Sequence, residues 1–273
     1  MPDAILAGHP VHWRTIGHGP RPVLALHCSL AHGGAWGPLG TALADAVTLT
    51  APDLPAHGRS GDWDRRTPMH RLATDVAGAM AQQVCGGAPV DVIGHSFGGT
   101  VALRLALERP ELVRSLVLVE PVFFAAARLA GSAAFTEFAA LQAPFSQALA
   151  EGDTDGAARW FHRMWGMGEE LEVLPEPQRR YIIDRIHVIP SVNDVLFDDR
   201  PGLLTPGRLE GLPIPVLLIE GQQSPPVIAA IMAALHTRLP QSRRLAVPGA
   251  THMVPITHAE VIAPAVRAHL GLQ

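Results

Sequence analysis

The sequence predicts an α/β fold, with a mostly parallel central sheet, helices on both faces and a helical lid. The chain has 273 residues, of which 48% are hydrophobic, and this suffices for one large core. Short β-rich runs alternate with longer helical stretches, as in parallel strands joined by helices. Several of these runs are almost entirely apolar, which is typical of strands covered on both faces.

Each expected element is a periodic run bounded by Pro, Gly or Asn-type breaks. The expected strands span residues 11–16, 23–27, 47–51, 90–93, 116–120, 216–220 and 244–247. The expected helices span residues 69–84, 98–108, 226–239 and 258–270.

The alternation stops between residues 123 and 209. This segment is helix-like, is rich in Ala, Trp, Phe and Met, and contains most of the aromatic residues of the chain. We therefore expect residues 123–209 to form a helical lid, inserted into a core domain made of residues 1–122 and 210–273.

The charge balance argues against several classes of partner. A formal net charge of -4 and a charged fraction of 17% leave no basic patch for a nucleic acid or an anionic membrane. No apolar run is long enough to span a bilayer, and the first residues lack a secretory pattern. We expect no nucleic-acid partner, no membrane partner and a cytoplasmic location.

Missing residue types exclude several mechanisms. All 21 basic residues are arginine, so neither a Schiff-base lysine nor a P-loop lysine can be present. The cysteines, Cys28 and Cys85, are too few for a disulfide scaffold, and we expect both to be reduced. His-Glu-x-x-His and Cys-x-x-Cys spacings do not occur, so we expect no metal and no cofactor.

The strongest chemical signal is a Gly-x-Ser-x-Gly motif. The apolar run from residue 90 continues into Gly94-His95-Ser96-Phe97-Gly98 and then directly into a helical pattern. A tight strand-to-helix turn holds the serine hydroxyl above the sheet, and the two glycines leave the space that it needs. The helix N-terminus favours negative charge on a substrate oxygen. A plain glycine-rich turn is the alternative, but both flanks favour Ser96 as a nucleophile.

This motif and three further segments resemble the α/β-hydrolase family, and the resemblance covers nearly the whole chain outside the predicted lid. Residues 23–29 are similar to the family's strand and oxyanion loop, with Cys28 at the usual glycine. Residues 52–60 are similar to its Asp-x-x-Gly-x-Gly-x-Ser turn, with Ala56 in one glycine position. Residues 249–255 are similar to the loop that bears the catalytic histidine.

The resemblance implies roles for individual residues. His252 is the expected general base, which takes the proton of Ser96 and returns it to the leaving group. The backbone N–H groups of Ser29 and Phe97 are the expected oxyanion hole. Asp53 is expected to brace the turn that follows it rather than to act as an acid.

The acid of the triad is where this sequence departs from the family pattern. The family usually places an aspartate three residues after the glycine that corresponds to Gly221, and Ser224 stands there. Glu120, at the carboxyl end of the strand after the nucleophile helix, is the expected replacement. Glu220 is the second candidate, and a purely structural role for Glu120 stays open.

The predicted lid points to an apolar small-molecule substrate. Its aromatic and methionine residues either pack lid helices on the core or form an apolar pocket, and together they favour the pocket. The expected pocket residues are Cys28, His95, Phe123, Phe124, Trp160 and Trp165.

Three functions follow from these residues. The preferred one is hydrolysis of a carboxylic ester, thioester or lactone through a Ser96 acyl-enzyme. The second is another reaction on the same scaffold, either hydrolytic C–C cleavage or cofactor-free perhydrolysis. The third is a binding protein whose catalysis has decayed, for which Ser224 is the main support.

Overall fold

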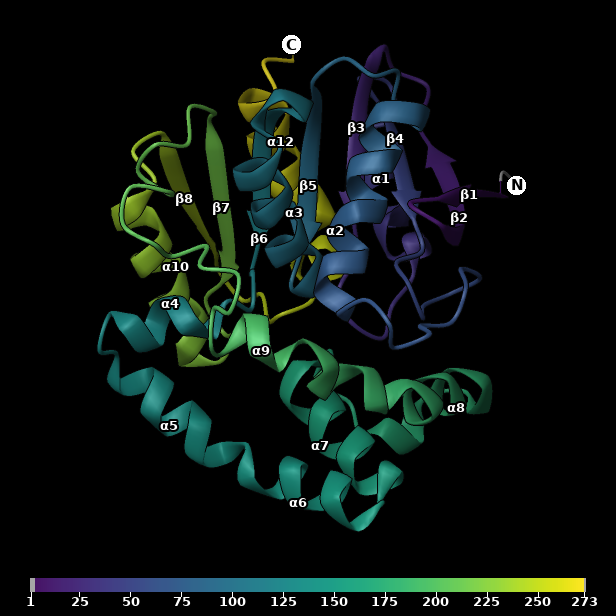
Figure 1. Ribbon diagram of the computed structural model, residues 1–273, viewed down its shortest axis with the longest axis vertical. Helices are drawn as coiled ribbons and strands as arrows, with labels where there is room; N and C mark the ends of the chain where they lie inside the picture. Colours follow the sequence, from purple (N-terminus) through teal and green to yellow (C-terminus); the bar gives the residue numbers. More distant parts are fainter. Residues whose placement is uncertain (1–2, 273) are drawn as a thin grey trace.

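The computed structural model describes residues 3–272 and forms an eight-stranded sheet with helices on both faces (Figure 1). The strand order is β1-β2-β4-β3-β5-β6-β7-β8. β1 and β2 form an antiparallel hairpin, β2 is antiparallel to β4, and all other pairs are parallel. The strands are β1 (Asp3–Leu6), β2 (His9–Ile16), β3 (Arg21–Leu26), β4 (Val47–Pro52), β5 (Val90–His95), β6 (Val113–Val119), β7 (Val216–Gly221) and β8 (Ser242–Val247).

Side chains alternate between the two faces of the central strands, because successive residues of a strand point to opposite sides. On β3, Leu24 and Leu26 belong to the apolar cluster that includes residues of α2 (Met69–Ala79), α3 (Phe97–Glu108) and α10 (Pro226–Arg238). Val23 and Ala25 pack on the other face, against α1 (Gly37–Ala42) and α12 (Ala259–His269). Both faces are therefore buried, which explains why the central strands are almost entirely apolar.

The predicted fold class is confirmed, with local differences. Every expected strand and helix is present, but β1 was not predicted, because its four residues are too short a run to distinguish a strand by periodicity. The helix expected over residues 69–84 is α2 followed by a π-helical turn (Met80–Val84). Residues 1, 2 and 273 of the predicted core domain lie outside the described residues.

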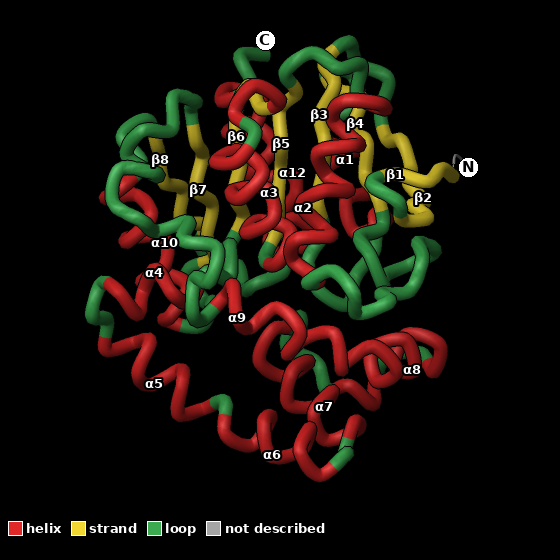
Figure 2. The backbone as a smooth tube through the Cα atoms, viewed as in Figure 1, coloured by secondary structure: helices red, strands yellow, loops and turns green. Residues whose placement is uncertain are grey.

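Residues 123–209, called the helical segment below, join β6 to β7. Its helices lie beyond the carboxyl ends of the strands, in the lower half of Figure 1, and Figure 2 shows helices and loops in this part of the chain. Among residues 3–272, no helix combines the length and apolar character needed to span a bilayer. The helices are α4 (Phe124–Leu129), α5 (Ala133–Leu141), α6 (Ala143–Glu151), α7 (Thr154–Trp165), α8 (Glu176–Arg185), the 3₁₀ helix η5 (Ile186–Val192) and α9 (Asn193–Leu196).

Candidate active site

Ser96 occupies a strained turn between β5 and α3. Its φ is 55° and its ψ is -117°, in a region that non-glycine residues rarely adopt. A Cβ on Gly94 would lie 2.3 Å from the carbonyl oxygen of Gly98, and a Cβ on Gly98 would lie 2.2 Å from that of Leu26. Glycine is required at both positions, and this geometry agrees with the elbow predicted from the motif.

The loop after β8 brings His252 against Glu120. His252 Nδ1 donates a hydrogen bond to Glu120 Oε2 at 2.6 Å, and both side chains are buried. Glu120 directly follows β6, with a φ of 45°. Its backbone N–H donates to the carbonyl of Ile219 on β7 at 2.9 Å, which fixes this unusual conformation. The site therefore contains a histidine paired with a desolvated carboxylate.

The second carboxylate oxygen of Glu120 is also fully engaged. Glu120 Oε1 accepts hydrogen bonds from the Gly221 N–H at 2.6 Å and from the Ser224 hydroxyl at 2.5 Å. Ser224 thus stands where the family's aspartate was expected and donates to the glutamate instead. Glu220, the second candidate, pairs with Arg244 at 2.5 Å, whereas the partner of His252 is Glu120.

Two rings pack against the imidazole of His252. The ring of Trp165, at the end of α7, lies 4.7 Å from it, and the ring of His95 lies 5.0 Å from it. His95 Nε2 donates a hydrogen bond to the carbonyl oxygen of His252 at 2.9 Å. Burial lowers the pKa of His95 well below its ordinary value, and the neighbouring His252 lowers it further. His95 is therefore a neutral support of the loop.

The predicted oxyanion groups lie at two loops. Neither the Ser29 N–H nor the Phe97 N–H donates to another protein group within residues 3–272, so both remain available to a substrate. The residues before Ser29 are tied to the loop after β4, because His27 Nε2 accepts a hydrogen bond from the Leu54 N–H at 2.8 Å. Asp53 accepts from the N–H of Gly33 at 2.7 Å and thus braces this loop as well as its own turn.

A family model described as the alpha/beta hydrolase family matches residues 23–265. The chain belongs to the alpha/beta hydrolase family. The resemblance predicted from four sequence segments is thereby confirmed, and the matched residues include the elbow, Glu120 and His252.

Two relatives of this hydrolase carry an activity in their names. It is 30% identical to the pimeloyl-[acyl-carrier protein] methyl ester esterase of Xanthomonas campestris pv. campestris (strain B100), over 93% of this chain and 96% of that protein. It is 41% identical to lipase LipV of Mycobacterium tuberculosis (strain ATCC 25618 / H37Rv), over 38% of each chain.

Solved structures show the same fold at low identity. An alpha/beta hydrolase from Sphaerobacter thermophilus DSM 20745 has a TM-score of 0.73 at 22% identity, covering 98% of this chain and 100% of that one. An esterase from Exiguobacterium antarcticum has a TM-score of 0.76 at 15% identity, covering 98% of both chains. At these identities the likeness concerns the fold.

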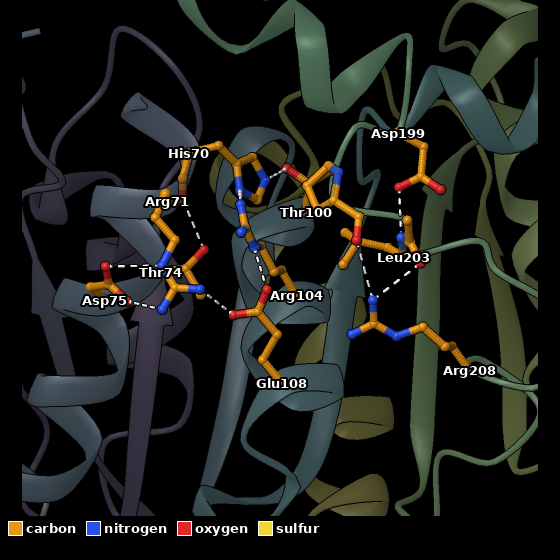
Figure 3. Close-up of polar contacts among 12 residues, drawn as sticks. His70, Arg71, Thr74, Asp75, Thr100, Arg104, Glu108, Asp199, Leu203 and Arg208 are labelled. Carbon is orange, nitrogen blue, oxygen red and sulfur yellow. Dashed lines mark hydrogen bonds and ion pairs between the residues drawn. The ribbon is translucent and has the colours of Figure 1, made fainter. Parts of the chain in front are cut away.

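A polar network joins α3, the helix that begins after Ser96, to α2 (Figure 3). The Thr100 hydroxyl, in the first turn of α3, donates to the carbonyl oxygen of Phe97 at 2.7 Å and accepts from His70 Nε2 at 3.2 Å. Arg104 donates to Glu108 at 2.8 Å, and Glu108 also accepts from Arg71 on α2 at 2.7 Å. This network was not predicted, because its members are spread over two helices and share no motif.

Tyr181 connects the helical segment to both loops of the site. Its hydroxyl donates to the carbonyl oxygen of Ala31 at 2.9 Å and accepts from the Gly58 N–H at 2.7 Å. The Arg185 guanidinium lies 4.1 Å from the centre of its ring. The sequence analysis missed this role. The one available signal was that Tyr181 is the chain's single tyrosine.

Two cavities meet at Ser96. The first cavity measures about 620 Å³ and the second about 560 Å³. Their walls have four residues in common, namely Ser29, Ser96, Phe161 and Trp165. His252 lines the second cavity, together with Tyr181 of the helical segment. Both cavities therefore lie between the core and the helical segment.

The predicted pocket residues divide into two groups. Phe124, Trp160 and Trp165 line the first cavity, and Cys28 lines the second. Burial raises the pKa of Cys28 to about 12, so its thiol stays protonated. His95 and Phe123 line neither cavity in the described part of the chain, and their assignment to the pocket is corrected. Phe123 is fully buried in the core because it packs where β6 turns toward α4.

The described residues were also compared with the groupings of side chains that bind metal ions. Between residues 3 and 272, no three His, Cys, Asp or Glu side chains are grouped as a metal site would require. The histidines of the site have other partners: His27 Nδ1 donates to the Cys28 carbonyl at 2.7 Å, and His252 pairs with Glu120.

Proposed function

We propose that this hydrolase cleaves carboxylic esters through a covalent acyl intermediate on Ser96; thioesters and lactones belong to the same reaction class. The observation that carries the proposal is the 2.6 Å hydrogen bond from His252 Nδ1 to Glu120, beside the strained elbow. Because Nδ1 is engaged, Nε2 is the imidazole nitrogen that can exchange a proton with Ser96.

The first half of the reaction forms the acyl-enzyme. Ser96 Oγ attacks the carbonyl carbon while His252 Nε2 takes the hydroxyl proton. The negative charge on the carbonyl oxygen accepts hydrogen bonds from the N–H groups of Ser29 and Phe97, and the dipole of α3 favours it further. The bond to the leaving oxygen then breaks, and His252 returns the proton to that oxygen.

The second half of the reaction restores the enzyme. His252 takes a proton from water, the hydroxide attacks the acyl carbon, and the ester bond to Ser96 Oγ breaks with return of the proton to Ser96. Glu120 stabilises the imidazolium in both halves, since its carboxylate lies 2.6 Å from Nδ1. Its hydrogen bonds from Gly221 and Ser224 hold the carboxylate in position beside the imidazole.

The substrate is a small, mostly apolar molecule. Aromatic side chains such as Phe145 and Trp160 line the first cavity, and apolar residues such as Leu174 and Ile182 line the second. The relatives named as an esterase and as a lipase also support ester hydrolysis. Since the helical segment supplies these walls, we assign it the function of a lid over the site.

The alternative functions lose their main support. Decayed catalysis was suggested by Ser224, which carries no charge, but Glu120 supplies a carboxylate to His252. C–C bond cleavage and perhydrolysis use the same scaffold, and no feature of this pocket favours them over ester hydrolysis. A substrate panel that contains esters, diketones and peroxide acceptors separates the three reactions.

The experiment that tests the proposal uses an active-site probe. A fluorophosphonate should label the wild-type serine, and Ser96→Ala should abolish both labelling and ester turnover without changing the melting temperature. Ser146→Ala, which removes a different hydroxyl from the first cavity, should retain both. Ester hydrolysis that persists in Ser96→Ala would refute the proposal.

A further inference from the structure

The two cavities differ in their access to the general acid. Both reach Ser96 and the oxyanion loop at Ser29, so a carbonyl group at the nucleophile can direct one substituent into each cavity. Among the described residues, however, His252 lines the second cavity and is absent from the wall of the first. The site is therefore asymmetric about the reacting carbon.

Proton transfer determines which half of the ester enters which cavity. When the bond to the leaving oxygen breaks, that oxygen must lie within hydrogen-bond reach of His252 Nε2, about 2.6–3.2 Å. The acyl substituent has no such requirement. The alcohol half of the substrate is thus directed into the cavity that contains His252, and the acyl half into the other.

The size of the second cavity limits the nature of the alcohol. A methyl group is little larger than a water molecule, whose share of liquid volume is about 30 Å³. The second cavity measures about 560 Å³, within the range of sites for whole drug-sized ligands. A methyl leaving group would leave nearly all of this space unused.

We infer that the substrate is an ester with two sizeable, mostly apolar halves, an acyl group in the first cavity and an alcohol in the second. This inference rests on the proposed function and specifies its substrate class. Attack by Ser96 Oγ forms the acyl–Oγ bond and breaks the bond from the acyl carbon to the alcohol oxygen. The alcohol leaves with the proton from His252, and water later releases the acid.

The chain offers a matched pair of residues with which to test this assignment. Ile182 lines the second cavity and Ile189 lines the first; both are half-buried and lie seven residues apart, in α8 and η5. Neither belongs to the catalytic groups. Ile182→Trp and Ile189→Trp should therefore each narrow one cavity with the same side chain.

The variants are compared on two ester series. One series keeps a butyryl group and enlarges the alcohol from methyl to benzyl, and the other keeps ethanol and enlarges the acyl group from acetyl to octanoyl. In the wild type, kcat/KM should rise by about fourfold for each methylene that becomes buried. In Ile182→Trp, kcat/KM should no longer rise with the size of the alcohol but should still rise with the length of the acyl group. In Ile189→Trp, kcat/KM should still rise with the size of the alcohol but no longer with the length of the acyl group.

Pre-steady-state kinetics give a second readout. Esters of one acid share the same acyl-enzyme, so Ile182→Trp should slow acylation by benzyl butyrate and leave the rate of deacylation unchanged. Ile189→Trp should change deacylation of a longer acyl group, because that group still occupies the first cavity. Melting temperatures verify that both variants are folded.

Several outcomes would overturn the inference. If Ile182→Trp changed the dependence on acyl length and Ile189→Trp changed the dependence on alcohol size, the acyl and alcohol groups would bind in the opposite cavities. Equal kcat/KM for methyl and benzyl esters would show that the alcohol is not bound in the second cavity. Both results would leave Ser96 labelled by fluorophosphonate and the proposed function intact. A wild-type protein that hydrolyses no ester and resists the probe would refute the proposed function as well.

Discussion

At the scale of single residues, the carboxylate of Glu120 has a complete set of partners. One oxygen accepts from His252, and the other accepts from Gly221 and Ser224. A buried carboxylate is stable as an ion when charged or dipolar donors surround it. Ser224 therefore completes the site instead of weakening it, although it replaces the acid of the common family pattern.

Replacing Glu120 should impair catalysis far more than substrate binding. Glu120→Gln preserves the shape but removes the negative charge beside the imidazolium, so kcat should fall by about 10² to 10⁴. Ser224→Ala removes one donor to the carboxylate but leaves its charge, and kcat should fall by less than about tenfold, consistent with the loss of one hydrogen bond. The measurement is kcat and KM on one activated ester, with thermal melts as the control.

A folded Glu120→Gln enzyme within about threefold of the wild type would show that Glu120 is structural, because such a change is under 1 kcal/mol of barrier. Ser224→Asp in the Glu120→Gln background should recover part of the lost activity. The new carboxylate would stand at the position where the common family pattern has its acid.

At the scale of elements, helix α8 contacts the loop at Ser29, the proposed oxyanion loop, from outside the core. The Tyr181 hydroxyl bridges the Ala31 carbonyl and the Gly58 N–H, and so joins the loop after β3 to the turn after β4. Leu30, between Ser29 and Ala31, has a φ of 59°. A loop with such a strained residue needs external contacts to keep its geometry.

Tyr181→Phe should therefore lower the rate of the chemical step. Loss of an oxyanion donor costs about 10² to 10³ in kcat, and a displaced donor should cost less, so we expect a fall of about tenfold. KM should change little, and affinity for a trifluoromethyl ketone, which mimics the oxyanion, should fall in parallel with kcat/KM. Arg185→Met removes the contact of α8 with Ala56 and the guanidinium over the Tyr181 ring but keeps the tyrosine hydroxyl, so it is the control for the two hydrogen bonds of that hydroxyl.

Unchanged kcat in Tyr181→Phe, or an equal fall in Arg185→Met, would argue that α8 only packs against the core. The ketone affinity separates these explanations, because general loosening of the fold does not weaken oxyanion binding selectively.

At the scale of the whole molecule, buried neutral histidines make stability depend on pH. Burial lowers the pKa of His57 to about 4 and that of His70 to about 3, from an ordinary value of 6.5, and Arg104 contributes to the shift of His70. As the pH falls below 6.5, the unfolded chain binds protons at these residues and the folded chain does not. Acid therefore favours unfolding.

The free energy of unfolding should be lower at pH 5 than at pH 8 by about 2 kcal/mol for each of these two histidines. Urea unfolding at the two pH values measures the difference. His70→Gln keeps an N–H donor for Thr100 but cannot be protonated in this pH range. The difference in unfolding free energy between pH 5 and pH 8 should therefore be about 2 kcal/mol smaller in this variant than in the wild type. A pH dependence equal to that of the wild type would show that His70 is not responsible.

Local sequence patterns predicted seven of the eight strands that the described residues form, the turn at Ser96 and the loop that carries His252. These features depend on local patterns: apolar runs buried on both faces, glycines where backbones approach, and a motif within five residues. The same local information led to two wrong pocket residues, His95 and Phe123, because it identified aromatic character without showing where each ring points.

The partners of Glu120 and Glu220 became evident only from the packing of the folded chain. The sequence favoured Glu120 and left Glu220 as the second candidate, and in the folded chain Glu120 contacts His252, 132 residues away, whereas Glu220 contacts Arg244. Tyr181 likewise reaches partners 123 and 150 residues away. Such contacts depend on how parallel strands and the helical segment pack in space, and no periodicity along the chain records them.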